Sequence, residues 1–191
     1  MSGGSAIIKK IMNPCREIFI DGRAYAINTE FYVWIEIENL LFGGKDDEQS
    51  LVGALALAFP VLPPEPKQAI EAIMWFICGG RLPEMAEGES GAVPCFDIRQ
   101  DFGYIWGAFI SEFGIDLSKS DMHWWHFLTL LGCLGDDCKF SRIVGCRSLD
   151  LRAVKDKELR QMYAKMKKKF ALKGTSAMGE QQIVDSLEGL F

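Results

Sequence analysis

The chain lacks any long apolar segment. No stretch approaches the ~18 uninterrupted apolar residues that are needed to span a bilayer, although 49% of its 191 residues are apolar. The sequence also shows no basic leader followed by an apolar run and a small-residue cleavage site. We therefore expect no membrane partner and a protein that stays in the cytosol where it is made.

The motifs of common enzymes are missing as well. The chain has two histidines, His123 and His126, each beside a tryptophan, and no nucleophile and orienting group are spaced around them as a triad would require. The glycine pairs at 43–44 and 79–80 lack the spacing of phosphate-binding loops. We expect neither enzymatic activity nor a cofactor.

The six cysteines include no C-x2-C pair. Cys133, Cys138 and Cys146 follow the two histidines, so a zinc site built from these residues is the sharpest chemical hypothesis. Four and seven residues separate the successive cysteines, which is a poor spacing for a structural zinc site. Buried thiols and hydrogen-bonded histidines are the favoured interpretation.

Charge is unevenly spread along an acidic chain of net charge −5. Residues 155–173 carry eight Lys/Arg and two acids, whereas 174–191 carry three acids. The acidic total argues against a nucleic-acid partner. For Lys165, Lys168 and Lys169 a solvated helix face is favoured over phosphate binding, and an acidic protein partner is the remaining alternative.

Helical periodicity dominates the sequence, and strand signals occur once. We predict a mainly α fold, an irregular bundle of six to seven helices with a small amino-terminal β-hairpin around Asp21 and Gly22. Asn28 or Thr29 is expected to cap the first helix and Asp97 a later one. In the last long helix the expected buried side is Leu159, Met162, Tyr163, Met166 and Phe170. The expected helices span 28–41, 48–59, 66–77, 97–113, 122–134, 141–145 and 156–171.

Composition divides the chain into four parts: a lobe with the hairpin over 1–80, a linker loop over 81–96, a helical lobe over 97–172 and a flexible tail over 173–191. The tail ends in a short apolar helix. Its stripe either packs back on the body or docks into a partner's groove. It consists of Ile183, Val184, Leu187, Leu190 and Phe191.

The run Met122 to Phe127 (MHWWHF) contains both histidines and two of the five tryptophans. It lies in a stretch from Asp97 to Leu172, DIRQDFGYIWGAFISEFGIDL, DMHWWHFLTLLGCLGDDCKF and SRIVGCRSLDLRAVKDKELRQMYAKMKKKFAL. This stretch resembles the gene-product-fifteen-like family of bacteriophage proteins. AINTEFYVWIEIENLL, from Ala26 to Leu41, is similar to the family's amino-terminal part. The matching positions are expected in the core: Trp34, Tyr104, Phe109, Trp124, Trp125 and Phe170.

The resemblance implies a tail assembly chaperone of a phage or prophage, made in the host bacterial cytoplasm. Such a protein would bind the tape measure protein and recruit tail tube subunits, the major tail protein, without catalytic residues. Two alternatives stay open, a stable structural component of the tail and a zinc-binding regulatory protein. The sequence does not fix the oligomeric state.

Overall fold

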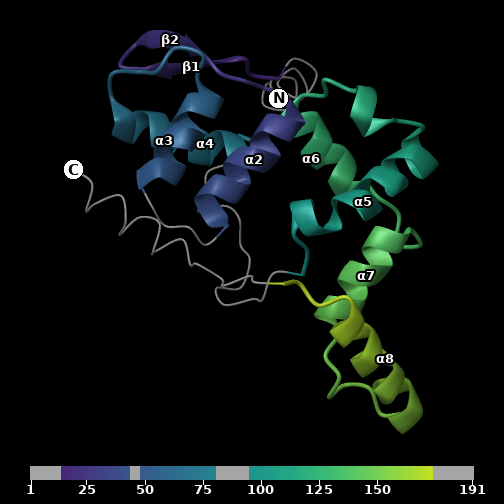
Figure 1. The fold of residues 1–191 in the computed structure, drawn as a ribbon. Coiled ribbons are helices and arrows are strands. Elements are labelled where there is room, and N and C mark those ends of the chain that lie inside the picture. Colours follow the sequence, from purple (N-terminus) through teal and green to yellow (C-terminus); the bar gives the residue numbers. More distant parts are fainter. Residues whose placement is uncertain (1–13, 44–47, 81–94, 174–191) are drawn as a thin grey trace, which may run out of the picture. The chain divides into compact units, whose positions relative to one another are not determined.

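The computed structural model describes residues 14–43, 48–80 and 95–173 (Figure 1). These residues form seven α-helices and one two-stranded hairpin, which confirms the predicted mainly α fold. A π-helix, η2 (Phe109–Phe113), follows α5, and a 3-10 turn, η3 (Leu117–Lys119), comes next. The helices are α2 (Phe31–Phe42), α3 (Glu48–Ala58), α4 (Pro66–Ile77), α5 (Ile98–Ala108), α6 (Trp124–Gly132), α7 (Lys139–Ser148) and α8 (Lys157–Lys169).

Contacts divide the described residues into two compact units. The first contains 14–43, 48–80 and 121–130, and the second contains 95–120 and 131–173. The sequence places the HWWHF run in the lobe 97–172, whereas its contacts place residues 121–130 with the first unit. Most of the expected linker loop, residues 81–94, lies outside the described residues.

The hairpin pairs β1 (Glu17–Ile20) with β2 (Arg23–Ala26) in antiparallel register. Asp21 and Gly22 at its turn both have positive φ, 48° and 75°. This pair of left-handed residues is what a tight type I′ turn requires, so the predicted hairpin is confirmed. The Gln68 side chain of α4 donates a hydrogen bond to Asp21 Oδ1 at 2.8 Å, which ties the turn to the helices.

The start of α2 differs from the prediction. Its N-cap residue is Glu30, which makes no side-chain capping hydrogen bond. Asn28, one of the two predicted caps, instead donates its side-chain amide to the carbonyl of Leu57 at 2.5 Å. The predicted cap is wrong because a backbone partner from a distant part of the chain takes over the capping role.

That partner is the segment just before α6. The N–H of Phe31, in the first turn of α2, donates to the carbonyl of Met122 at 2.9 Å. In return the N–H of Trp124 donates to the carbonyl of Thr29 at 2.7 Å. The starts of the two helices therefore satisfy one another's backbone groups, which would otherwise lack an intrahelical partner.

Stacked aromatic rings fill the first unit. Trp34 of α2 is fully buried and stacks on Phe76 of α4, with ring centroids 4.4 Å apart. Phe31 stacks on Phe127 of α6 at 5.0 Å, and Trp124 stacks on Phe127 at 5.6 Å. Helices α2, α4 and α6 thus contribute large rings to one core, where apolar burial supplies most of the stabilisation.

The two tryptophans of α6 also satisfy the carboxyl end of α4. Trp124 Nε1 donates to the carbonyl of Ile77 at 3.0 Å, and Trp125 Nε1 donates to the carbonyl of Phe76 at 2.9 Å. Gly80 lies next to this contact at φ 78°, and a Cβ there would come within 2.9 Å of the Trp125 ring. Neither a side chain at position 80 nor a smaller ring at 125 would reproduce the contact.

We predict that Trp124→Ala destabilises the protein by about 3–5 kcal/mol, because it removes a buried ring and a carbonyl's partner. Urea unfolding followed by circular dichroism measures the loss. Trp106→Ala is the matched control, since Trp106 is 38% exposed, and it should cost about 1 kcal/mol. Equal effects of the two changes would contradict the core role of Trp124.

In the second unit, Asp97 caps α5 as predicted, accepting the N–H of Gln100 at 2.8 Å. The aromatic residues of this segment differ in burial: Phe109 is fully buried, whereas Trp106 is exposed. The buried side of α5 includes a carboxylate, which the apolar pattern could not reveal. It consists of Ile98, Asp101, Ile105 and Ala108.

Helix α7 is longer than the expected 141–145, because its N-cap is Cys138 and Gly145 does not end it. The Cys138 Sγ accepts the N–H of Ser141 at 3.4 Å. Within the ranges that the structure describes, no helix has both the length and the apolar character needed to cross a membrane.

Candidate protein-binding surface

Helix α8 exposes the side that the sequence predicts to be buried. None of its thirteen residues is buried. Leu159 is 42% exposed and Met162 is 46% exposed, while Tyr163, Met166 and Phe170 are half-buried. The predicted burial is therefore wrong. The helix packs against α7, and one neighbouring helix covers only part of an apolar stripe.

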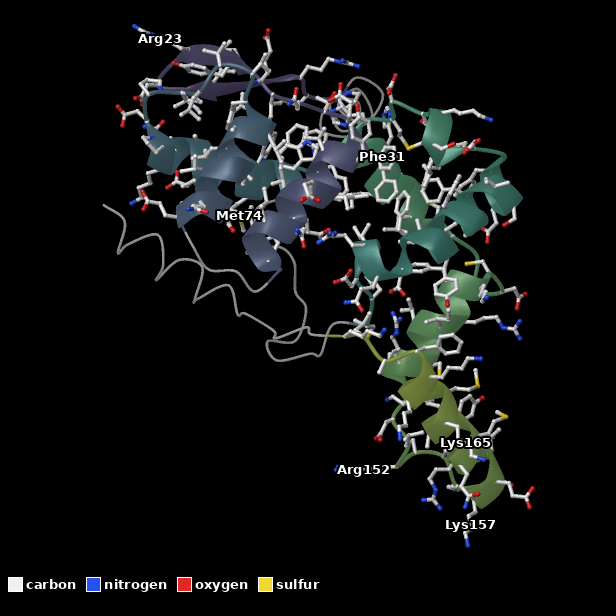
Figure 2. All side chains as sticks on the ribbon, in the orientation of Figure 1. Arg23, Phe31, Met74, Arg152, Lys157 and Lys165 are labelled. Carbon is white, nitrogen blue, oxygen red and sulfur yellow. The ribbon has the colours of Figure 1, made fainter. Side chains whose placement is uncertain are left out.

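Basic side chains also project from α8, among them Lys165 (Figure 2). Lys165 and Lys168 are exposed, and the Lys169 ammonium lies 5.4 Å from the centre of the Phe170 ring. Neither ion pair found within the described residues involves these three lysines. At helical spacing Lys165 and Lys169 lie along one edge of the stripe, whereas Lys168 lies on the opposite side of the helix. We call the five apolar residues and the two edge lysines the α8 surface: Leu159, Met162, Tyr163, Met166, Phe170, Lys165 and Lys169.

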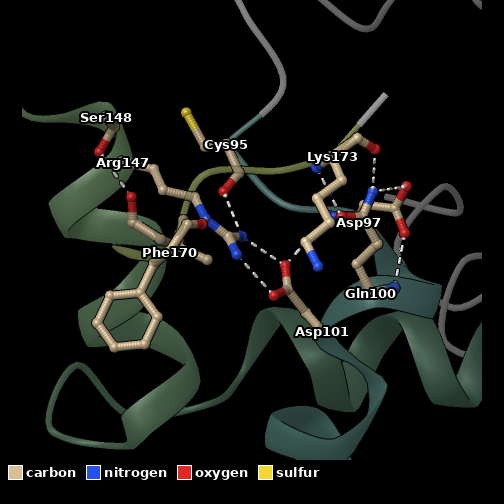
Figure 3. A network of polar contacts seen from close by, with 9 residues as sticks. Cys95, Asp97, Gln100, Asp101, Arg147, Ser148, Phe170 and Lys173 are labelled. Carbon is tan, nitrogen blue, oxygen red and sulfur yellow. Dashed lines mark hydrogen bonds and ion pairs between the residues drawn. The ribbon is translucent and has the colours of Figure 1, made fainter. Parts of the chain in front are cut away.

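One arginine holds the end of α8 in place (Figure 3). Arg147 of α7 forms a bidentate ion pair with Asp101 of α5, at 2.5 and 2.8 Å. Its Nε donates to the carbonyl of Phe170 at 2.6 Å, and its Nη1 donates to the carbonyl of Cys95 at 3.2 Å. The hydrogen bond with Asp101 is the main cause that raises the pKa of Arg147, so the guanidinium stays charged.

The chain after α8 is anchored to α5 by a second contact (Figure 3). The Gln100 side chain donates to the carbonyl of Lys173 at 3.0 Å and accepts the N–H of Lys173 at 2.8 Å. These two hydrogen bonds fix the point from which residues 174–191 continue. Neither Gln100 nor Arg147 carries a sequence signal that would have marked it as a partner of α8.

We predict that Arg147→Met destabilises the protein by about 3–5 kcal/mol, because Asp101 would remain as an uncompensated buried carboxylate. Asp101 is 1% exposed. Thermal and urea unfolding measure the change. Arg142→Met, an exposed arginine on the same helix, is the control and should change stability by about 0.5 kcal/mol or less. A small loss for Arg147→Met would show that the ion pair contributes little.

Both ring nitrogens of His123 have backbone partners. Nδ1 accepts the N–H of Trp125 at 3.0 Å, so Nε2 carries the hydrogen and donates to the carbonyl of Cys15, also at 3.0 Å. Burial lowers the pKa of His123, and the hydrogen bond to Cys15 only partly opposes this shift. The imidazole is therefore a neutral structural group that links 14–15 to the start of α6.

The structure does not gather the residues of the zinc hypothesis. Within 14–43, 48–80 and 95–173, no group of three or more His, Cys, Asp or Glu side chains is arranged to hold a metal ion. His123 would have to give up at least the hydrogen bond of the ligating ring nitrogen to become a ligand. Cys138 caps α7, Cys146 is buried and Cys133 is exposed, so the three thiols have different environments.

We predict that stability falls as the pH drops below about 6.5, because the unfolded chain binds a proton at the ordinary pKa of histidine and the folded chain resists it. Above that pH His123 is neutral in the folded and in the unfolded chain, so its contribution to the free energy of unfolding is fully present. Melting temperatures at about pH 7.5 and about pH 5.5 measure it. His123→Gln should flatten the difference, whereas His126→Gln should retain most of it, because burial of His123 is unchanged. An equal pH response of wild type and His123→Gln would contradict this assignment.

The other residues singled out in the sequence fall into three groups. Four of the positions that carry the family resemblance are buried, namely Trp34, Phe109, Trp124 and Trp125. Tyr104 and Phe170 are half-buried, and the Lys139 ammonium lies 4.9 Å from the centre of the Tyr104 ring. The third group lies outside the described residues: Ile183, Val184, Leu187, Leu190 and Phe191.

Comparison with known proteins gives one family. The family model described as Bacteriophage Gp15 protein matches residues 14–172. No curated protein and no solved structure matches the chain. The matched range contains both structural units, the HWWHF segment and the α8 surface.

Proposed function

The chain belongs to the bacteriophage Gp15 protein family, and on this basis we propose that it is a tail assembly chaperone. It binds the tape measure protein, keeps that long chain soluble and recruits tail tube subunits, the major tail protein. It acts in the cytoplasm of the host bacterium and is encoded either by a phage or by a prophage. The proposed activity is binding without catalysis, and it needs no cofactor, nucleic acid or membrane.

The observation that carries this proposal is the α8 surface. Its Leu159 and Met162 leave 42% and 46% of their area exposed, which places apolar side chains where another chain can cover them. Methionine is unbranched and adaptable, so Met162 and Met166 can fit apolar side chains of different shapes. A chaperone that holds a long polypeptide benefits from this tolerance.

The lysines add a preference for acidic partners. Lys165 and Lys169 are four residues apart, so they lie on one edge of the apolar stripe. A partner helix with an apolar face and acidic neighbours would place apolar groups on Met162 and carboxylates near this edge. The expected recognition element is therefore an acidic amphipathic segment of the tape measure protein.

We predict that Met162→Glu lowers the soluble amount of a co-expressed tape measure protein from the same phage genome about threefold or more, since a charge would be placed in the apolar contact. Centrifugation and gel densitometry measure the soluble fraction. The matched control is Val52→Glu, because Val52 is 58% exposed on α3. It adds the same charge to another helix and should leave the soluble fraction unchanged.

Both variants should keep the circular dichroism spectrum of the wild type, because neither side chain is part of the core. If Met162→Glu folds and still keeps the tape measure protein soluble, the α8 surface is not the binding site. Mass spectrometry of purified phage particles tests the other interpretation. Stoichiometric copies of this protein in finished tails would support a structural component and contradict the chaperone.

A further inference from the structure

One edge of the α8 surface is bordered by charges of both signs. Glu158 precedes Lys165 by seven residues and Lys169 by eleven, which is close to two and three turns of a helix, so the three side chains follow one line along α8. All three are exposed, and no ion pair within the described residues involves any of them. We call Glu158, Lys165 and Lys169 the charged edge.

We propose that the charged edge sets the direction in which a partner helix binds. The α8 surface takes an amphipathic helix that runs antiparallel to α8. Acidic residues in the first turns of that helix face Lys165 and Lys169, and a basic residue near its end faces Glu158. The inference rests on the proposed binding role of the α8 surface, and it adds Glu158 as a residue that determines specificity.

The apolar part of the contact lies beside the charged edge. Leu159 and Met162 expose 42% and 46% of their area, and Met166, one turn after Met162, is half-buried. Helical spacing places Met162 between Leu159 and the charged edge. A helix that covers Leu159 and Met162 with its apolar side chains must therefore bring one of its own flanks against the charged edge.

The order of charges along this edge favours an antiparallel partner. Glu158 lies in the first turn of α8, and lysines fill its last turn, as the helix dipole favours. An antiparallel partner has its first turns beside Lys165 and Lys169, so acids placed there face the lysines and also complement the partner's own dipole. A parallel partner would need basic first turns and acidic last turns, which oppose its dipole. Complementarity across the contact and within the partner therefore agree in the antiparallel direction.

Charge also disfavours a second copy of α8 as the occupant. In an antiparallel pair of two α8 helices, each Glu158 could meet a Lys169 of the other copy. The helix Lys157–Lys169 carries six Lys/Arg and a single acid, so the pair would also bring two strongly basic helices together. The observations therefore favour a partner with acidic first turns over self-association.

The test uses two synthetic peptides of about 18 residues, each held helical by a covalent side-chain link because helices of this length are marginal in water. The first has an apolar face flanked by two glutamates four residues apart and, seven residues later, a lysine. The second has the same composition with the order of these three charges reversed. Fluorescence anisotropy with the full-length protein measures both affinities. The first peptide should bind about fivefold more tightly or better, because each ion pair contributes modestly.

A photoreactive group at the amino end of the first peptide reports the direction itself. It should cross-link to residues 166–170, at the end of α8, and mass spectrometry identifies the site. Cross-links to residues 157–160 would show a parallel helix and overturn the proposal. Equal affinities of the two peptides would also overturn it, while leaving the binding role of the α8 surface in place.

A charge exchange tests Glu158 at about 0.15 M salt, where charges more than about 8 Å apart are largely screened. Wild-type protein should prefer the first peptide over a version with glutamate in place of its lysine. Glu158→Lys should invert that preference. The matched control is Glu71→Lys, the same change at an exposed position of α4, and it should keep the wild-type preference. An unchanged preference in Glu158→Lys would show that Glu158 does not face the partner.

Sedimentation velocity of the peptide-free protein tests the other occupant. Dimers that Met162→Glu abolishes would assign the α8 surface to a second copy and overturn the proposal. Failure of both peptides to bind would overturn it as well. The chaperone activity is judged separately, by the soluble amount of co-expressed tape measure protein, so the two proposals can fail independently.

Discussion

The organisation of the first unit depends on the attachment of residues 121–130 to helices α2 and α4. Two backbone hydrogen bonds join the starts of α2 and α6, and two indole N–H groups occupy the last carbonyls of α4. These bonds connect residues separated by more than forty positions. Backbone groups at helix ends must find partners when they are buried, so losing this segment would expose the ends of two helices together.

In the second unit, Arg147 performs the comparable role. It joins α5, through Asp101, to the last residues of α8, through the carbonyl of Phe170. The helix itself has no buried residue, and polar contacts hold it: Arg147 binds the carbonyl of Phe170 at its carboxyl-terminal end, and the Lys167 ammonium donates to the carbonyl of Leu149 at 2.7 Å. This explains how an apolar stripe can be held in place while it remains exposed, which is the property that a binding surface requires.

The aromatic content of the HWWHF run predicts a buried helix, and the structure places Trp124, Trp125 and Phe127 in the core. The predicted cap of α2 is wrong because the local sequence around Asn28 is typical of an N-cap, whereas its side chain bonds to the carbonyl of Leu57, which is distant in the sequence. The predicted buried side of α8 fails for a related reason. Periodicity shows that Leu159 and Met162 share a face, but it does not show whether another element covers that face.

The sequence by itself determined the helices, the hairpin turn at Asp21 and Gly22, and the cap at Asp97, because each follows from local backbone preferences. It also determined family membership through residues 14–172. The tertiary structure alone decided that residues 121–130 belong with the first unit, that Asp101 is buried against Arg147 and that the apolar side of α8 is exposed. Burial is a property of neighbours, and neighbours far apart in the chain leave no periodic mark on either segment.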